Sequence, residues 1–305
     1  MGDVMSVRDR ARKEFARLPP GVRKLVLHRM GRYAPWEREF DFTPPPLAPG
    51  DVAGPPDFVG IGVQKAGTTW WYRLLLTHPD IASRPGVHKE RHFLDRFGTE
   101  PFGPLEVDRY HGWFPRPEGA VTGEWTPDYF SYPWVPPLLK QAAPDARLLL
   151  LLRDPVERFQ SGLAHQGRMG SLGTSTSITD AVERGFYHRT IGDWLRCFPR
   201  EQLLILQYER CVADPEGQLR ATFRFLGLPE MRLTSLEQPL GTPAETKVGL
   251  DEDVRRRLTA IYEPDVAALA RHVPDLDLSL WPNFSYLTSA QTLSEDGSNS
   301  PTSRA

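Results

Sequence analysis

The segment GVQKAGTT, residues 62–69, has the composition of a loop that binds an anion. It follows the apolar run DFVGIG and precedes the amphipathic segment WWYRLLL, so a strand, a turn and a helix are expected in that order. Gly62 and Gly67 permit backbone torsions that side chains obstruct, which lets N–H groups at the start of the helix converge on phosphate oxygens. Lys65 adds a cation to this predicted anion site.

The spacing of this loop resembles the P-loop pattern GxxxxGK[ST], with one displacement. Thr68 stands where a P-loop has its lysine, and Lys65 lies earlier. A nucleoside triphosphatase needs that lysine on the terminal phosphates and a hydroxyl on magnesium, so the displacement argues against a kinase or nucleotidase. The structural alternative is a glycine turn between a strand and a helix, with Trp70 and Trp71 as core residues.

A second anion site is predicted at the end of another apolar run, in RLLLLLRDPVERFQS. Arg153 ends the expected strand and Ser161 follows about two turns into the expected helix, so both side chains can face one ligand. Asp154 and Pro155 are typical of a helix cap and a first helical position. An RDP turn before a helix also occurs without any ligand, which is the alternative here.

Between these motifs, HKERHFLDRFG is dense in groups that can take or hold a proton. Glu90 and His92 are candidate bases, because removing a proton from an attacking hydroxyl requires a carboxylate or an imidazole within hydrogen-bond reach. A strand is predicted around residues 91–94, and residues two apart on a strand project to the same face. A surface salt bridge for Glu90 and a structural hydrogen bond for His92 are the alternatives.

Together these segments resemble the sulfotransferases that use 3′-phosphoadenosine 5′-phosphosulfate (PAPS), in particular the heparan-sulfate type and related bacterial enzymes. KAGTTW resembles the family's 5′-phosphosulfate loop, Arg153 and Ser161 match its 3′-phosphate motif, and KERHFLD resembles its KExHFF(D) segment. The resemblance implies Glu90 as general base, with His92 in reserve, and Lys65 as a catalytic cation. The donor-binding residues that it implies are Lys65, Ala66, Gly67, Thr68, Thr69, Trp70 (beside the adenine), Arg153, Ser161 and Lys247.

Two departures from the family pattern affect the site. GEWTPDYFSYP resembles the family's EKTPxYF segment beside the acceptor, but Trp125 replaces a lysine thought to assist catalysis. That role is then missing, taken by Lys65 or supplied elsewhere. A further alternative is that the tryptophan favours an apolar or ring-shaped acceptor, which Glu124 and Asp128 could contact; helix capping or turn formation is the other interpretation of Asp128. Around Lys247 the RKG triplet of cytosolic members is absent.

Short apolar runs alternate with helical patterns, which predicts an α/β protein: a P-loop-like three-layer fold with a central parallel sheet flanked by helices. Strands are expected at residues 57–62, 91–94, 120–124, 147–152 and 202–207. Helices are expected at residues 68–77, 107–114, 133–142, 155–165, 190–197, 215–226 and 251–272.

Composition argues against several classes of protein. A formal net charge of −2 gives no global field to attract nucleic acid or an anionic membrane. Two cysteines cannot form a disulfide framework, and no apolar run approaches the ~20 residues that span a bilayer, so a cytoplasmic protein without a transmembrane segment is expected. Residues 1–56 are interpreted as a basic, proline-rich extension, 57–287 as the sulfotransferase domain and 288–305 as a disordered tail.

The sequence therefore predicts a sulfotransferase that moves the sulfuryl group of PAPS to a hydroxyl or amine of a small-molecule or glycan acceptor, releases adenosine 3′,5′-bisphosphate and needs no metal. Two alternatives stay open. The first is a P-loop kinase or another nucleotide-binding protein. The second, suggested by Trp125, is a catalytically silent protein that keeps the PAPS site. These motifs do not specify the acceptor or the oligomeric state.

Overall fold

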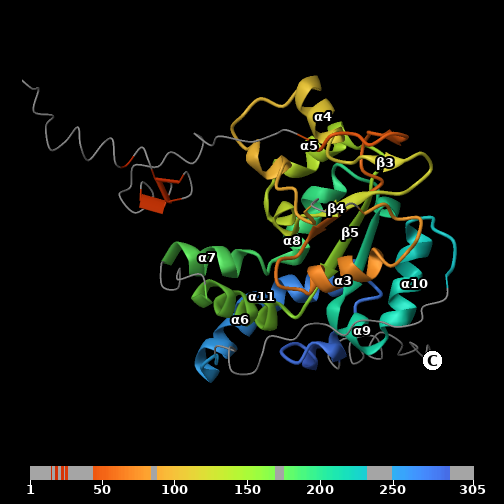
Figure 1. Ribbon diagram of the computed structural model, residues 1–305. Helices are drawn as coiled ribbons and strands as arrows, with labels where there is room; N and C mark the ends of the chain where they lie inside the picture. Colours follow the sequence, from red (N-terminus) through yellow and green to blue (C-terminus); the bar gives the residue numbers. More distant parts are fainter. Residues whose placement is uncertain are drawn as a thin grey trace, which may run out of the picture. The chain divides into compact units, whose positions relative to one another are not determined.

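Four parallel strands form the central sheet in the computed structural model of the protein (Figure 1). In the order in which they lie across the sheet, they are β4 (Gly123–Trp125), β2 (Phe58–Gly62), β5 (Arg147–Leu152) and β6 (Leu203–Gln207). Every residue of β2 is buried, and in β5 only Arg147 is partly exposed. Apolar strands of this kind are typical of a parallel sheet with both faces covered by helices. The predicted parallel sheet is confirmed.

The structure describes residues 44–83, 88–168, 175–231 and 249–288, together with a few residues between 15 and 26. The chain divides into two compact units, Met1–Phe42 and Thr43–Ala305. Most of the predicted extension, nearly all of the predicted tail, and Lys247 lie outside the described residues. Among the helices described, none combines the length and the apolar character that a membrane span requires.

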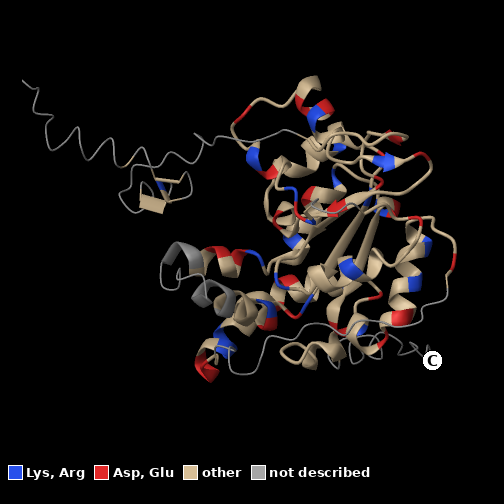
Figure 2. Ribbon diagram, viewed as in Figure 1, with Lys and Arg blue, Asp and Glu red and all other residues tan. Residues whose placement is uncertain are grey.

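The helices of the described part surround this sheet, and Figure 2 shows acidic and basic residues interspersed over them, with the strands largely uncharged. They are α3 (Thr68–Leu75), α4 (Pro104–His111), α5 (Val135–Ala142), α6 (Pro155–Arg168), α7 (Ser175–Glu183), α8 (Tyr187–Leu195), α9 (Tyr208–Ala213), α10 (Pro215–Phe225) and α11 (Glu252–His272). The short elements are β1 (Asp51–Val52), antiparallel to β3 (Arg116–Pro117), and the 3₁₀ helices η1 (Leu94–Arg96), η2 (Pro127–Ser131), η3 (Arg200–Gln202) and η5 (Leu278–Leu280).

Every helix expected from the sequence has a counterpart whose ends lie within about three residues of the expected ones. The sequence does not predict α7 and α9. The sequence of α7, STSITDAVE, is rich in serine and threonine, which favour caps and turns over helix interiors. Helix α9 has six residues and begins directly after β6, so no turn signal separates the two.

The strand expected at residues 91–94 is wrong, because this segment is a loop that leads into η1. Its backbone N–H groups bond to side chains instead of a neighbouring strand. The N–H group of Arg91 donates to the hydroxyl of Thr126 at 3.0 Å. The N–H group of Phe93 donates to the hydroxyl of Tyr129 at 3.1 Å. Side chains that offer such bonds compete with strand pairing, which residue type alone does not reveal.

The predicted anion loop lies at the carboxyl end of β2, where the order in which the chain adds strands to the sheet reverses. The chain passes from β2 to β4 on one side of it and then crosses from β4 to β5 on its other side, so the strand order reverses at β2. In open α/β sheets a crevice forms at such a switch point, outside the carboxyl ends of the strands. Arg153 directly follows β5, so both predicted anion motifs lie at the same end of adjacent strands.

Trp125, at the end of β4, is a core residue. Its side chain is fully buried, and the indole N–H donates to the carbonyl of Gly62 at 3.2 Å. A Cβ atom on Gly60 would lie 2.0 Å from the indole Cδ2 atom, so β2 carries a glycine where the indole packs. Trp125 therefore does not line a surface for an acceptor, and the interpretation that it favours an apolar or ring-shaped acceptor is wrong.

Gly60→Ala is expected to destabilise the protein by about 1–3 kcal/mol, because the added methyl group must displace a packed indole. The measurement is the free energy of unfolding in urea, followed by tryptophan fluorescence. Gly192→Ala on α8 is the matched control, since a Cβ atom there has nothing within 4 Å and the helix should gain up to about 1 kcal/mol. Equal stability of the two variants would show that the indole does not constrain this strand.

Candidate active site

The phosphate loop turns into α3 through Gly67, whose φ of 86° is a left-handed conformation that favours glycine. The ring of Tyr208 lies against this glycine, and an added Cβ atom would be 2.7 Å from the ring atom Cε2. Thr68 and Thr69 follow as the first residues of the helix, at its positive end. Helix N–H groups and hydroxyl donors at a glycine bend without room for a side chain fit a phosphate or sulfate group.

Arg153 lies beside this loop. One guanidinium N–H donates to the carbonyl of Lys65 at 3.2 Å, and the guanidinium lies over the ring of Tyr208, 4.9 Å from its centroid. The hydroxyl of Tyr187 donates to the carbonyl of Arg153 at 2.9 Å. Arg153 of the second anion motif and Gly67 of the first therefore both contact the ring of Tyr208.

The turn that follows Arg153 is held by buried carboxylates. Asp154 Oδ1 accepts from the N–H group of Val156 at 2.9 Å, so Asp154 caps α6 as predicted. Asp154 Oδ2 accepts from the backbone and the side chain of Asn283, at 3.0 and 2.9 Å. Glu209 accepts from the N–H group of Asp154 at 3.0 Å, and burial raises the pKa of the Glu209 carboxyl to about 7. Contacts distant in sequence thus fix the position of Arg153.

The other predicted donor residues have different surroundings. Ala66 is fully buried. Trp70 is buried as well, and its ring meets those of Trp71 and Tyr208 edge to face. Ser161 lies on α6 and is partly exposed. The adenine contact of Trp70 and the phosphate contact of Ser161 stay predictions.

Lys89 is a candidate site residue that the sequence analysis did not single out. Its ammonium donates to the hydroxyls of Thr68 and Thr69, both at 3.2 Å, and pairs with the carboxylate of Glu90 at 2.8 Å. Burial lowers the pKa of Lys89, and its hydrogen bond to Glu90 opposes this shift. A cation therefore joins the phosphate loop to the predicted base. Lysine is rare in this arginine-rich chain, and that rarity was a signal that could have identified Lys89.

Glu90, His92 and Asp95 form one cluster. His92 Nε2 lies 3.3 Å from Glu90 Oε2, and His92 Nδ1 lies 2.7 Å from Asp95 Oδ2. The hydrogen bond to Asp95, followed by that to Glu90, raises the pKa of His92 to about 10 against the effect of burial. Burial alone would raise the pKa of Glu90, but hydrogen bonds from His92 and Lys89 lower it to about 2. At neutral pH Glu90 is therefore negatively charged and His92 positively charged. A loop brings the two side chains together, in place of the expected strand.

The fully buried carboxylate of Glu124 holds this loop in place. Four groups donate hydrogen bonds to it: the hydroxyls of Thr126 (2.6 Å), Tyr110 (2.7 Å) and Tyr129 (3.1 Å), and the backbone N–H of Arg91 (3.1 Å). Burial raises the pKa of Glu124, and the charge of Arg91 opposes this shift. Glu124 is therefore a structural anchor, and the expectation that it contacts the acceptor is wrong. Its signal in the sequence is a carboxylate inside an otherwise apolar strand.

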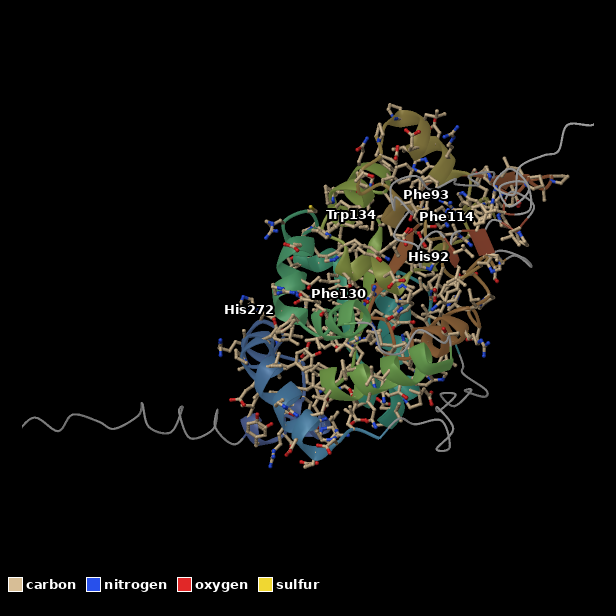
Figure 3. All side chains as sticks on the ribbon, turned by 90° about the vertical axis from the view of Figure 1, so that its left-hand side faces the viewer. His92, Phe93, Phe114, Phe130, Trp134 and His272 are labelled. Carbon is tan, nitrogen blue, oxygen red and sulfur yellow. The ribbon has the colours of Figure 1, made fainter. Side chains whose placement is uncertain are left out.

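Aromatic rings support the same loop from behind. The ring of Phe93 lies 5.3 Å from that of Phe97 and 5.2 Å from that of Tyr110. The ring of Tyr110 in turn lies 4.9 Å from that of Phe114, on the segment after α4. Figure 3 shows His92, Phe93 and Phe114 near one another. The candidate base is thus carried on a loop whose next residues are packed in the core.

The profile of the sulfotransferase domain family matches residues 55–252, which include the phosphate loop, the Glu90 loop and the turn at Arg153. The chain belongs to this family. A solved sulfotransferase from Alicyclobacillus acidocaldarius has a similar structure, with a TM-score of 0.58 and 27% identity, over 74% of this chain and 98% of that chain. The family resemblance predicted from the motifs is confirmed, and so is the P-loop-like α/β fold.

Curated relatives named as heparan sulfate glucosamine 3-O-sulfotransferases are also similar. The 3A1 enzyme of Mus musculus is 34% identical over 191 residues, which cover 57% of this chain and 46% of the relative. The 3A1 enzyme of Homo sapiens is 29% identical over 252 residues, which cover 68% of this chain and 58% of the relative. The chain spans about half the length of these relatives.

Glu124→Ala is expected to lower the free energy of unfolding by about 1–3 kcal/mol for each buried donor that loses its partner. The measurement is urea unfolding of the variant against the parent sulfotransferase domain. Glu118→Ala, which removes a carboxylate from an exposed turn, is the matched control and should change stability by less than about 0.5 kcal/mol. Similar stability of both variants would mean that the buried carboxylate does not anchor the loop.

Proposed function

We propose that the protein transfers the sulfuryl group of PAPS to a hydroxyl or amine of a glycan or small-molecule acceptor and releases adenosine 3′,5′-bisphosphate. One observation carries this proposal: the ammonium of Lys89 joins the threonine hydroxyls of the phosphate loop to the Glu90 carboxylate. Such a transfer requires a donor anion and an acceptor proton to meet at one place. Membership of the sulfotransferase domain family supports the same reaction.

In this proposal the phosphate loop holds the phosphosulfate end of the donor, which supplies the sulfuryl group when bound. Lys65, the hydroxyls of Thr68 and Thr69, and the N–H groups at the start of α3 stabilise the charge that develops on the bridging oxygen. Arg153 and Ser161 hold the 3′-phosphate, because a planar guanidinium fork matches phosphate oxygens. Thr68 and Thr69 lie at the glycine bend, and the guanidinium of Arg153 lies over the ring of Tyr208, which supports their part in these assignments.

Glu90 is the general base. Its carboxylate takes the proton of the acceptor hydroxyl while the acceptor oxygen attacks sulfur. A new sulfur–oxygen bond forms as the sulfur–oxygen bond to the 5′-phosphate breaks, and the electron pair stays on that phosphate. His92 is already protonated, so it orients Glu90 through Nε2 and does not take the proton itself. Asp95 holds the opposite nitrogen of the same ring.

A glycan is the favoured acceptor, because the names of similar curated relatives specify heparan sulfate glucosamine. On the side of the candidate base, Asp128 of η2 pairs with Arg184, and the rings of Tyr132 and Trp134 stack at 4.8 Å.

A cytoplasmic location is supported by Cys197 and Cys211, which are both free thiols. The similarity to the Alicyclobacillus acidocaldarius enzyme supports a bacterial source.

Isothermal titration calorimetry should show that adenosine 3′,5′-bisphosphate binds without magnesium, and more tightly than magnesium ATP. Arg153→Ala should weaken this binding by about 10- to 100-fold, because a hydrogen-bonded charge pair with phosphate is lost. Arg147→Ala, at the opposite end of β5, is the matched control and should bind like the parent. Tighter binding of magnesium ATP would favour the kinase alternative.

Glu90→Gln is expected to lower turnover by at least about 100-fold, because the amide cannot accept the acceptor proton. The measurement is transfer from labelled PAPS to a panel of glycans and small molecules, together with calorimetry of adenosine 3′,5′-bisphosphate, whose affinity should not fall. Glu118→Gln, on an exposed turn, is the control and should keep the parent rate. Equal turnover of Glu90→Gln and the parent would remove Glu90 as the base. A parent that binds the nucleotide and modifies no acceptor would favour the silent binding protein.

A further inference from the structure

The ammonium of Lys89 has three N–H groups, and the protein provides three acceptors for them. Two acceptors are the hydroxyl oxygens of Thr68 and Thr69, each at 3.2 Å. The third is the carboxylate of Glu90 at 2.8 Å. The side chain of Lys89 is 13% exposed and that of Glu90 is 37% exposed. A largely buried cation thus lies between the start of α3 and a more accessible carboxylate.

The contact with Lys89 also sets the direction of the two hydroxyl groups. An ammonium only donates, so each threonine oxygen accepts from Lys89 and its own hydrogen points elsewhere. An anion seated at the positive end of α3 can accept both of these hydrogens. Lys89 therefore prepares the loop as a set of donors, in addition to bringing its own positive charge.

The backbone of Lys89 is tied to the residue that departs from the family pattern. Its carbonyl accepts from the N–H group of Trp125 at 2.9 Å. The indole of Trp125 is buried and bonded to the carbonyl of Gly62, at the start of the phosphate loop. Trp125, which replaces the family's lysine, therefore holds the backbone of Lys89. The ammonium of Lys89 in turn contacts the phosphate loop.

We infer that Lys89 is a second cation of the donor site and that it couples donor binding to the base. This inference rests on the proposed function. With the loop empty, the third N–H of Lys89 binds Glu90. With the donor in the loop, Lys89 exchanges the Glu90 carboxylate for a phosphosulfate oxygen. Glu90 is then free to take the acceptor proton, while Lys89 stabilises the charge left on the 5′-phosphate.

This exchange changes Glu90 in the direction that a base requires. Burial favours the protonated carboxyl, yet the bonds from His92 and Lys89 outweigh it and hold the pKa at about 2, which makes the carboxylate a weak base. Removing the hydrogen bond from Lys89 takes away one of the interactions that oppose burial, so the pKa of Glu90 rises. The base therefore strengthens at the time when a donor is present to use it.

Calorimetry with adenosine 3′,5′-bisphosphate tests the inference without an acceptor. Lys89→Met should bind this nucleotide about 10- to 100-fold more weakly than the parent, because a charge-assisted hydrogen bond to the 5′-phosphate is lost. Glu90→Gln should bind it about 3- to 10-fold more tightly, because a neutral amide holds Lys89 less strongly. In the Lys89→Met background, adding Glu90→Gln should give no such gain.

The matched control is Lys140→Met on α5, whose ammonium donates to the carbonyl of Pro144 at 2.8 Å; it should bind the nucleotide like the parent. Parent-like affinity of Lys89→Met would overturn Lys89 as a donor cation. An equal gain from Glu90→Gln in both backgrounds would overturn the coupling, since simple charge repulsion would then explain it. If circular dichroism shows that Lys89→Met does not fold, Lys89→Gln takes its place. A folded parent that does not bind the nucleotide would contradict the proposed function instead.

Discussion

The geometry of the candidate site depends on the buried carboxylate of Glu124. A charge with no exposed surface is tolerated only when hydrogen-bond donors surround it, and Glu124 has four. One donor is the backbone of the Glu90 loop, and another is Tyr129, whose hydroxyl also accepts from the N–H groups of Phe93 and Leu94. Side-chain hydrogen bonds therefore hold most of this loop, and one backbone hydrogen bond, from the N–H group of Trp125 to the carbonyl of Lys89, joins it to β4.

Beside this anchor, charged and polar side chains contact one another in series. The threonines of the phosphate loop accept from Lys89, Lys89 pairs with Glu90, and His92 lies between Glu90 and Asp95. Each group contacts the next, and such networks are strong where water is partly excluded. In the proposed function, the site for the donor and the site for proton transfer therefore belong to one network. Lys89 contacts both parts of this network.

Trp125 fills the core beside the phosphate loop and also holds the backbone of Lys89. Its indole packs where β2 has Gly60 and bonds to the carbonyl of Gly62, so a bulky residue fits without opening the sheet. Its backbone N–H donates to the carbonyl of Lys89 and so fixes the backbone from which that side chain extends. The interpretation of Trp125 as an acceptor contact failed because residue type alone does not tell which way a side chain projects from a strand end.

The sequence by itself determined the features whose signals are local. The glycine bend before α3, the aspartate cap before α6 and the apolar strands each depend on neighbouring residues. The order of these elements was enough to predict a parallel sheet with two anion motifs, each following the end of a strand. Only the tertiary structure decided the form of residues 91–94, the burial of Glu124 and the position of Lys89. The physical reason is that these features depend on side-chain hydrogen bonds across 20 or more residues, as between Lys89 and Thr69, and across 33, as between Arg91 and Glu124.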